Sequence, residues 1–137
     1  MCIMKTQGDG VADVSKIGEI NPKHFENVFP VLTNDVVITD ERIAHIKAHH
    51  PKDYERYAEY IPQILKNPDY ILKANRPHSA VLLKEFKKSD ERFQLILRLR
   101  TSQDPDEFSN SVITFSRLHA KEYRRFVRNK KVLYKSE

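Results

Sequence analysis

The sequence predicts an α+β fold, with helices in the first half of the chain, a four-stranded antiparallel sheet after them and a basic helix at the end. Apolar residues recur at helical spacing between residues 40 and 67, and at every second position from residue 70 onward. Turn-forming stretches separate the alternating segments, as in an antiparallel meander. The 137 residues fit one domain, which we expect over 14–137 after a flexible leader at 1–13.

Two short strands and a brief helix are expected first. Alternation predicts a strand over 14–20, and the compact apolar run 36–38 predicts another. Between them, Asn21 and Pro22 are typical of the cap and the first position of a short helix.

A helix carrying three of the six histidines follows directly after residue 38. Thr39 and Asp40 are candidates for its N-cap. Pro51 disfavours helical backbone at the residue before it, so the helix is expected to end at His49 or His50.

The remaining helices and the sheet are delimited by prolines and by the change of period. A second helix is expected over 52–60, a third from Pro62 to residue 67, and the last over 119–129. The four strands of the meander are expected over 70–74, 79–86, 93–101 and 111–116.

The strand 93–101 has one apolar and one polar face. Its odd-numbered residues from Phe93 to Leu99 are apolar, which places Arg98 and Arg100 together on the opposite, open side. Ser111 and Thr114 fall on opposite faces of a regular strand, so they can line one site only across a bulge.

Charge is concentrated at the end of the chain. Residues 117–137 hold eight basic and two acidic side chains, which exceeds the net charge of +5 of the whole sequence. Such a basic element favours a polyanionic partner, with nucleic acid ahead of membrane, or else a solvated helix face. The exposed arginines expected on the last helix are Arg124, Arg125 and Arg128.

Composition excludes several classes of protein. Cys2 is the only cysteine, so a disulfide framework and a thiolate zinc site are excluded and a reducing compartment is favoured. We find neither a signal-peptide run nor an apolar stretch long enough to span a membrane, which leads us to expect a cytoplasmic protein without membrane contact.

The histidine-bearing helix is suited to acid/base chemistry. Its helical wheel places Arg42, His45 and His49 on one face, with His50 close to an isoleucine face. Imidazole both takes and gives a proton near neutral pH.

These residues fit cleavage of RNA by its own 2′-hydroxyl, which needs a base, an acid and a cation for the phosphorane and needs no cofactor. His45 or His50 would serve as base or acid. The candidates for the cation are Arg98, Arg100 and Lys84, and those for a hydroxyl donor to phosphate are Ser111 and Thr114.

Two alternatives remain open. His45 and His49 have the i, i+4 spacing of zinc ligands, but Ile46 stands where zinc enzymes of the His-Glu-x-x-His type have glutamate. The third ligand would have to come from His24, His78 or His119. The other alternative is a module that binds nucleic acid, or serves a phage structure, without turnover.

Several short motifs, in order, resemble the phage-associated nucleases of the barnase, EndoU, colicin and RelE-like superfamily. They are the segment from the apolar strand at 36–38 through His50-Pro51, the run from Ile61 to Ile71, Leu83-Lys84, and Asn110 to Thr114 followed by a basic helix and Tyr134. The similarity covers most of the chain, about 36–134.

The resemblance implies N-terminal helices packed on the antiparallel sheet, with RNA cleaved across that sheet without a metal. It matches His45 and His50 to the paired helix histidines, Lys84 to the strand lysine, and Ser111 with Thr114 to the late hydroxyl positions. Tyr134 is a weaker match, and His49 stands where a basic residue is expected. Substrate contacts are therefore expected from Arg42, His49, Arg100, Arg124, Arg125, Arg128 and Tyr134.

The resemblance also implies partners. Members of the superfamily commonly act as toxins or phage-borne effectors, so we expect RNA, with tRNA among the candidates, as substrate. An antitoxin or immunity protein in a bacterial host would restrain such an activity.

Overall fold

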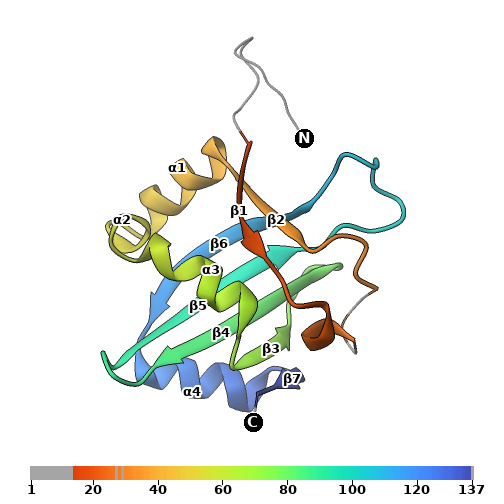
Figure 1. Cartoon of the computed structure of the whole chain (residues 1–137). Helices are drawn as coiled ribbons and strands as arrows, with labels where there is room; N and C mark the ends of the chain where they lie inside the picture. Colours follow the sequence, from red (N-terminus) through yellow and green to blue (C-terminus); the bar gives the residue numbers. More distant parts are fainter. Residues whose placement is uncertain (1–13, 27, 29, 137) are drawn as a thin grey trace.

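The computed structural model describes residues 14–26, 28 and 30–136, and in it a seven-stranded mixed sheet carries helices on both faces (Figure 1). The strands are β1 (Val14–Glu19), β2 (Asp35–Thr39), β3 (Tyr70–Lys73), β4 (Ser79–Phe86), β5 (Glu91–Arg98), β6 (Asn110–Leu118) and β7 (Val132–Lys135). The helices are α1 (Asp40–His49), α2 (Asp53–Tyr57), α3 (Ile61–Lys66) and α4 (Ala120–Asn129), with 3-10 helices η1 (Pro22–Phe25) and η2 (Ala58–Tyr60). The leader expected over 1–13 lies outside the described residues.

The strand order is β1-β2-β6-β5-β4-β3-β7. Its middle, from β6 to β3, is the antiparallel meander that alternation predicts. The prediction of four strands is wrong, because β2 adds parallel to β6, β1 pairs with β2, and β7 pairs with β3. Alternation identifies a strand by its buried positions, but it does not say which neighbour the strand pairs with.

The two faces of the sheet are covered by different helices. On the first, which we call the α3 face, residues of α1, α2 and α3 pack against the apolar stripe of β5 that includes Phe93, Leu95 and Leu97. On the second, the α4 face, Tyr123 and neighbouring residues of α4 pack against a smaller group that includes Leu83. In Figure 1, α3 crosses one side of the sheet and α4 lies on the other.

An aromatic cluster anchors the core of the α3 face. Phe93 is fully buried, and its ring stacks on Phe115 at a centroid distance of 5.6 Å with 13° between the planes. The rings of Tyr57 and Phe86 approach it at 5.0 and 5.8 Å. Phe93 thus ties the middle strands to α2.

A glycine permits the close approach of α3 to β1. A Cβ atom at Gly18 would lie 2.8 Å from Cδ1 of Leu65 and 3.4 Å from Cα of Pro62. The first contact is closer than real Cβ atoms tolerate, so a larger residue here would force the side chain of Leu65 to move.

We expect Phe93→Ala to lower the free energy of unfolding by about 3–5 kcal/mol, because it removes a fully buried ring and leaves a cavity. Urea unfolding measures the change. The matched control is Phe108→Ala, since Phe108 is 47% exposed and its loss should cost less than about 0.5 kcal/mol. Equal effects of the two substitutions would contradict this account of the core.

Candidate active site

Helix α1 presents three basic side chains on one face. It starts directly after β2, where the Thr39 hydroxyl accepts a hydrogen bond of 3.1 Å from the backbone N–H of Arg42. It ends at His49, and His50 has left the helical region with φ of −133°, which confirms the predicted cap and end. We call Arg42, His45 and His49 the histidine face.

Two histidine rings are in contact on this face. The ring centroids of His45 and His49 are 4.4 Å apart, with 43° between the planes. The sequence favours His45 and His50 as the functional pair, whereas the ring contact in the structure joins His45 to His49. His50 is half-buried, and its backbone N–H donates to the carbonyl of Ile46.

The pKa of His45 is lowered from its ordinary value of 6.5. The first cause is that neighbouring groups partly exclude water from the ring, and the next are the positive charges of His49, Arg42 and His50. The carboxylate of Glu41 opposes the shift. His45 is therefore neutral at pH 7 and able to accept a proton.

The histidine face adjoins the edge of β6. Strand β2 pairs with β6 only at Asn110 and Ser111, so the rest of that edge needs other partners. The guanidinium of Arg42 lies 3.5 Å from the carbonyl oxygen of Ile113, and the carboxylate of Asp53 accepts from the backbone N–H of Arg117 at 3.0 Å. Side chains from α1 and α2 thus cover the edge that β2 leaves open.

A bulge in β6 brings two hydroxyl residues to one face. Ile96 of β5 pairs with Thr114 and Leu97 with Val112, so Ile113 is the extra residue. Ser111 pairs with Arg98, two positions from Ile96, and both hydroxyl residues therefore lie on the α4 face. The condition that the sequence sets for Ser111 and Thr114 to share a site is met.

Arg98 lies on the same face and is held by a carboxylate. Its two terminal nitrogens each donate to one oxygen of Asp104 at 3.0 Å, and its side chain remains 40% exposed. These bonds, with one from the backbone N–H of Thr101, lower the pKa of Asp104 to about 2. The pair fixes the direction of the guanidinium and anchors the loop between β5 and β6.

Lys84 lies on the opposite side of the sheet. It pairs across the strands with Phe93, whose ring is in the core of the α3 face. Its ammonium group is 3.3 Å from the carboxylate of Asp69, which also accepts from the backbone N–H of Glu85. Lys84 therefore does not share a face with Arg98, the other strand residue proposed as the cation.

The other expected substrate contacts are dispersed. Arg100 is mostly buried and donates to Asp106 at 3.1 Å, and Tyr134 stacks on His24 at 4.5 Å near the far edge of the sheet. The α4 arginines are exposed and, in the part of the chain that the structure describes, form no ion pair. They are Arg124, Arg125 and Arg128.

Sequence reasoning missed a buried residue that positions the start of β6. The Asn110 amide donates to the carbonyls of Thr33 and Asp35 and accepts from the backbone N–H of Arg100, with distances of 2.8–3.1 Å. It is 2% exposed. The sequence pattern that could have identified it is an asparagine at the first position of an apolar strand, because a buried amide needs hydrogen-bond partners.

Within residues 14–26, 28 and 30–136, no three histidine, cysteine, aspartate or glutamate side chains gather as a metal site. His45 and His49 thus have no third ligand among the described residues. No helix in the same ranges is both long and apolar enough to cross a membrane.

The chain was compared with protein families, with curated proteins and with solved structures. The family model described as phage-Barnase-EndoU-ColicinE5/D-RelE like nuclease2 matches residues 11–135. Neither curated proteins nor solved structures give a match.

We expect the imidazole of His45 to titrate below 6.5 in an NMR pH series, and His49→Asn to move its pKa upward. The reason is that the substitution removes a positive charge that disfavours protonation of His45. His119→Asn, a histidine at the start of α4, serves as control and should leave the titration unchanged. A wild-type value at or above 6.5 would contradict this account of the cluster.

Proposed function

We propose that this chain, which belongs to the phage-Barnase-EndoU-ColicinE5/D-RelE like nuclease2 family, is an endoribonuclease that cleaves RNA without a metal ion. The family supports a nuclease. The observation that carries the RNA mechanism is the contact of two histidine rings at 4.4 Å on α1, the helix whose Arg42 reaches the bulge of β6. Two imidazoles in contact supply a base and an acid, which is what attack by a 2′-hydroxyl requires.

In the proposed reaction, His45 is the base. Its lowered pKa keeps the ring neutral at pH 7, so it accepts the proton of the 2′-hydroxyl as that oxygen forms a bond to the adjacent phosphorus. The bond from phosphorus to the 5′ oxygen then breaks. The products are a 2′,3′-cyclic phosphate and a free 5′-hydroxyl.

His49 is the acid in this scheme. In its charged form it gives a proton to the departing 5′ oxygen, so protons balance over the step. A positive charge on one ring disfavours a second on the ring 4.4 Å away. His50, the partner that the sequence favoured, is the alternative acid.

The extra negative charge on phosphorus is met by groups around the bulge. Arg42 reaches the backbone of β6 at Ile113, and Ser111 and Thr114 offer hydroxyl donors on the α4 face. Arg98, fixed by Asp104, adds a positioned cation. The scheme assigns no role to Lys84, whose ammonium group is 3.3 Å from the carboxylate of Asp69.

A second candidate is a module that binds nucleic acid without cleaving it. The exposed arginines of α4 favour it, because they carry charge toward solvent away from the histidine face. Such a module would be recognised by nucleic-acid binding that weakens as salt is added and that persists when both histidines are replaced. For the nuclease, the fitting biological role is a toxin or phage-borne effector restrained by an antitoxin or immunity protein.

The test is incubation of the purified chain with RNA in EDTA, with the product ends identified by mass spectrometry. We expect 2′,3′-cyclic phosphate ends. His45→Ala and His49→Ala should each slow cleavage by about a hundred- to ten-thousand-fold, because each removes a general acid or base.

Two controls make the result specific. His119→Asn should cleave at the wild-type rate, since His119 caps α4 and lies outside the histidine face. An RNA with a single 2′-deoxy position at the cleavage site should remain intact there. Intact RNA with the wild-type chain, or activity retained in both histidine variants, would refute the proposal.

A further inference from the structure

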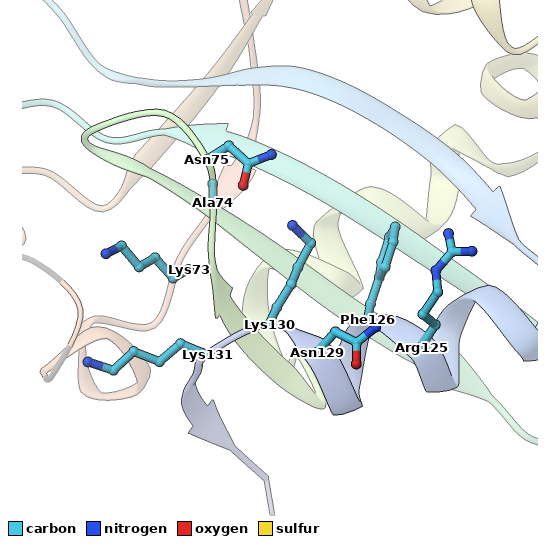
Figure 2. Close-up of a pocket in the computed structure, with 8 residues that line it drawn as sticks. All are labelled: Lys73, Ala74, Asn75, Arg125, Phe126, Asn129, Lys130 and Lys131. Atoms are coloured by element: carbon cyan, nitrogen blue, oxygen red, sulfur yellow. The ribbon is translucent and has the colours of Figure 1, made fainter.

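A basic pocket lies between the end of β3 and the end of α4. It has a volume of about 620 Å³, and its lining includes the cationic residues Lys73, Arg125, Lys130 and Lys131. Lys130 and Arg125 extend beside Phe126, whereas Lys73 and Lys131 extend to the left in Figure 2, away from that ring. The backbone N–H of Lys73 donates to the carbonyl of Lys131 at 2.9 Å, which joins the two walls.

The pocket is suited to an anion. Its lining contains no acidic residue, and none of its four cations forms an ion pair with another described residue. The C-terminal end of α4 contributes a partial charge of only about −0.5, which four full positive charges outweigh. The phosphodiester backbone of nucleic acid is a common biological ligand that matches such a surface.

An aromatic ring in the pocket adds a platform for a base. Phe126 packs against the core of the α4 face and is half-buried, so part of its ring is accessible. Arg125 and Lys130 lie 5.7 and 5.6 Å from its centroid. Asn75 and Asn129 supply amides at the rim (Figure 2). Cations around a partly accessible aromatic ring are the pattern of single-strand recognition, in which phosphates are paired and a base is stacked.

The register of the sheet connects this pocket to the candidate active site. Lys73 pairs with Ala80, Ala80 with Leu97, and Leu97 with Val112, which follows Ser111. Three strand spacings amount to about 14 Å. Phe126 packs on the α4 face, where the hydroxyls of β6 also lie, so one extended strand can reach both. Lys73 pairs with Ala80 of the α3-face core, so its side chain lies at the rim of the pocket on the other side of the sheet.

We propose that this pocket binds single-stranded RNA a few nucleotides away from the cleaved bond, with phosphates on its lysines and arginine and a base stacked on Phe126. The choice of RNA over DNA rests on the proposed function. The pocket itself does not depend on cleavage, so binding can be tested without it.

The experiment measures anisotropy of a labelled single-stranded RNA of about ten nucleotides, using the variant His45→Ala/His49→Ala so that the probe stays intact. Adding Lys73→Gln/Lys131→Gln should raise Kd about tenfold and reduce the slope of log Kd against log salt by about 1.4, for two lost phosphate contacts. Phe126→Leu should raise Kd about fivefold with the slope unchanged, because it removes stacking and no charge.

The matched control is Lys87→Gln/Lys88→Gln, which removes the same charge from two exposed lysines in the turn after β4. It should change Kd less than twofold. If the two double lysine substitutions raise Kd equally, only the net charge of the protein attracts RNA. That result would overturn the proposal that the pocket binds RNA. A duplex of equal length that binds as tightly as the single strand would overturn the preference for single strands.

Cleavage assays separate this inference from the proposed function. On the otherwise wild-type chain, Lys73→Gln/Lys131→Gln should raise KM for the ten-nucleotide RNA and leave cleavage of a dinucleotide unchanged, since a dinucleotide does not reach the pocket. Pocket-dependent binding without any cleavage would sustain the inference and refute the nuclease. If the chain cleaves RNA and neither binding nor KM responds to the pocket variants, the nuclease is supported and the inference about the pocket is refuted.

Discussion

Strand β6 has an edge that β2 covers for only two residues, and the arrangement of the candidate site follows from how the remaining edge is satisfied. Unpaired backbone groups next to a core are costly, so helices must supply partners where the neighbouring strand departs. Arg42 does so for the carbonyl of Ile113 and Asp53 for the N–H of Arg117. Because Thr39 caps α1 directly at the end of β2, the helix has no loop in which to move away. The start of α1, with Arg42, is thereby held against β6, and the exposed rings of His45 and His49 follow on the same helix face.

The bulge at Ile113 complements this constraint. Without the extra residue, Ser111 and Thr114 would lie on opposite faces, and one of them would point into the core beside Phe115. With it, both lie on the α4 face near Arg98. The two faces of the sheet thus differ. The α3 face holds the aromatic core, while the α4 face carries the hydroxyls of β6, Arg98 and, farther along, Phe126 of the basic pocket.

Sequence patterns predict what depends on local spacing and miss what depends on pairing. The helix end at His49, the cap at Thr39 and the meander from β3 to β6 follow from proline chemistry and alternation, and all three are confirmed. The edge strands change the sheet from four strands to seven because a short apolar run such as 132–134 has no local mark of its partner.

The site residues show the same limit. Alternation places Lys84 with Leu82 and Phe86, but only the pairing with Phe93 reveals that this is the core face. No glycine marks the bulge in 110–118. The sequence predicts Asp104 only as part of a turn. Its bidentate hydrogen bond with Arg98 forms because the loop between β5 and β6 folds back on the strand.

The central claim is that the histidine face of α1 and the hydroxyls of β6 hold a single phosphate. A crystal structure of the chain with an RNA carrying a 2′-deoxy nucleotide at the cleavage site tests it most directly. We predict that the phosphate at that site lies within about 2.7–3.2 Å of a nitrogen of His45 or His49 and of the hydroxyl of Ser111 or Thr114. A phosphate bound beside Lys84 on the α3 face, with the histidines unengaged, would contradict the account.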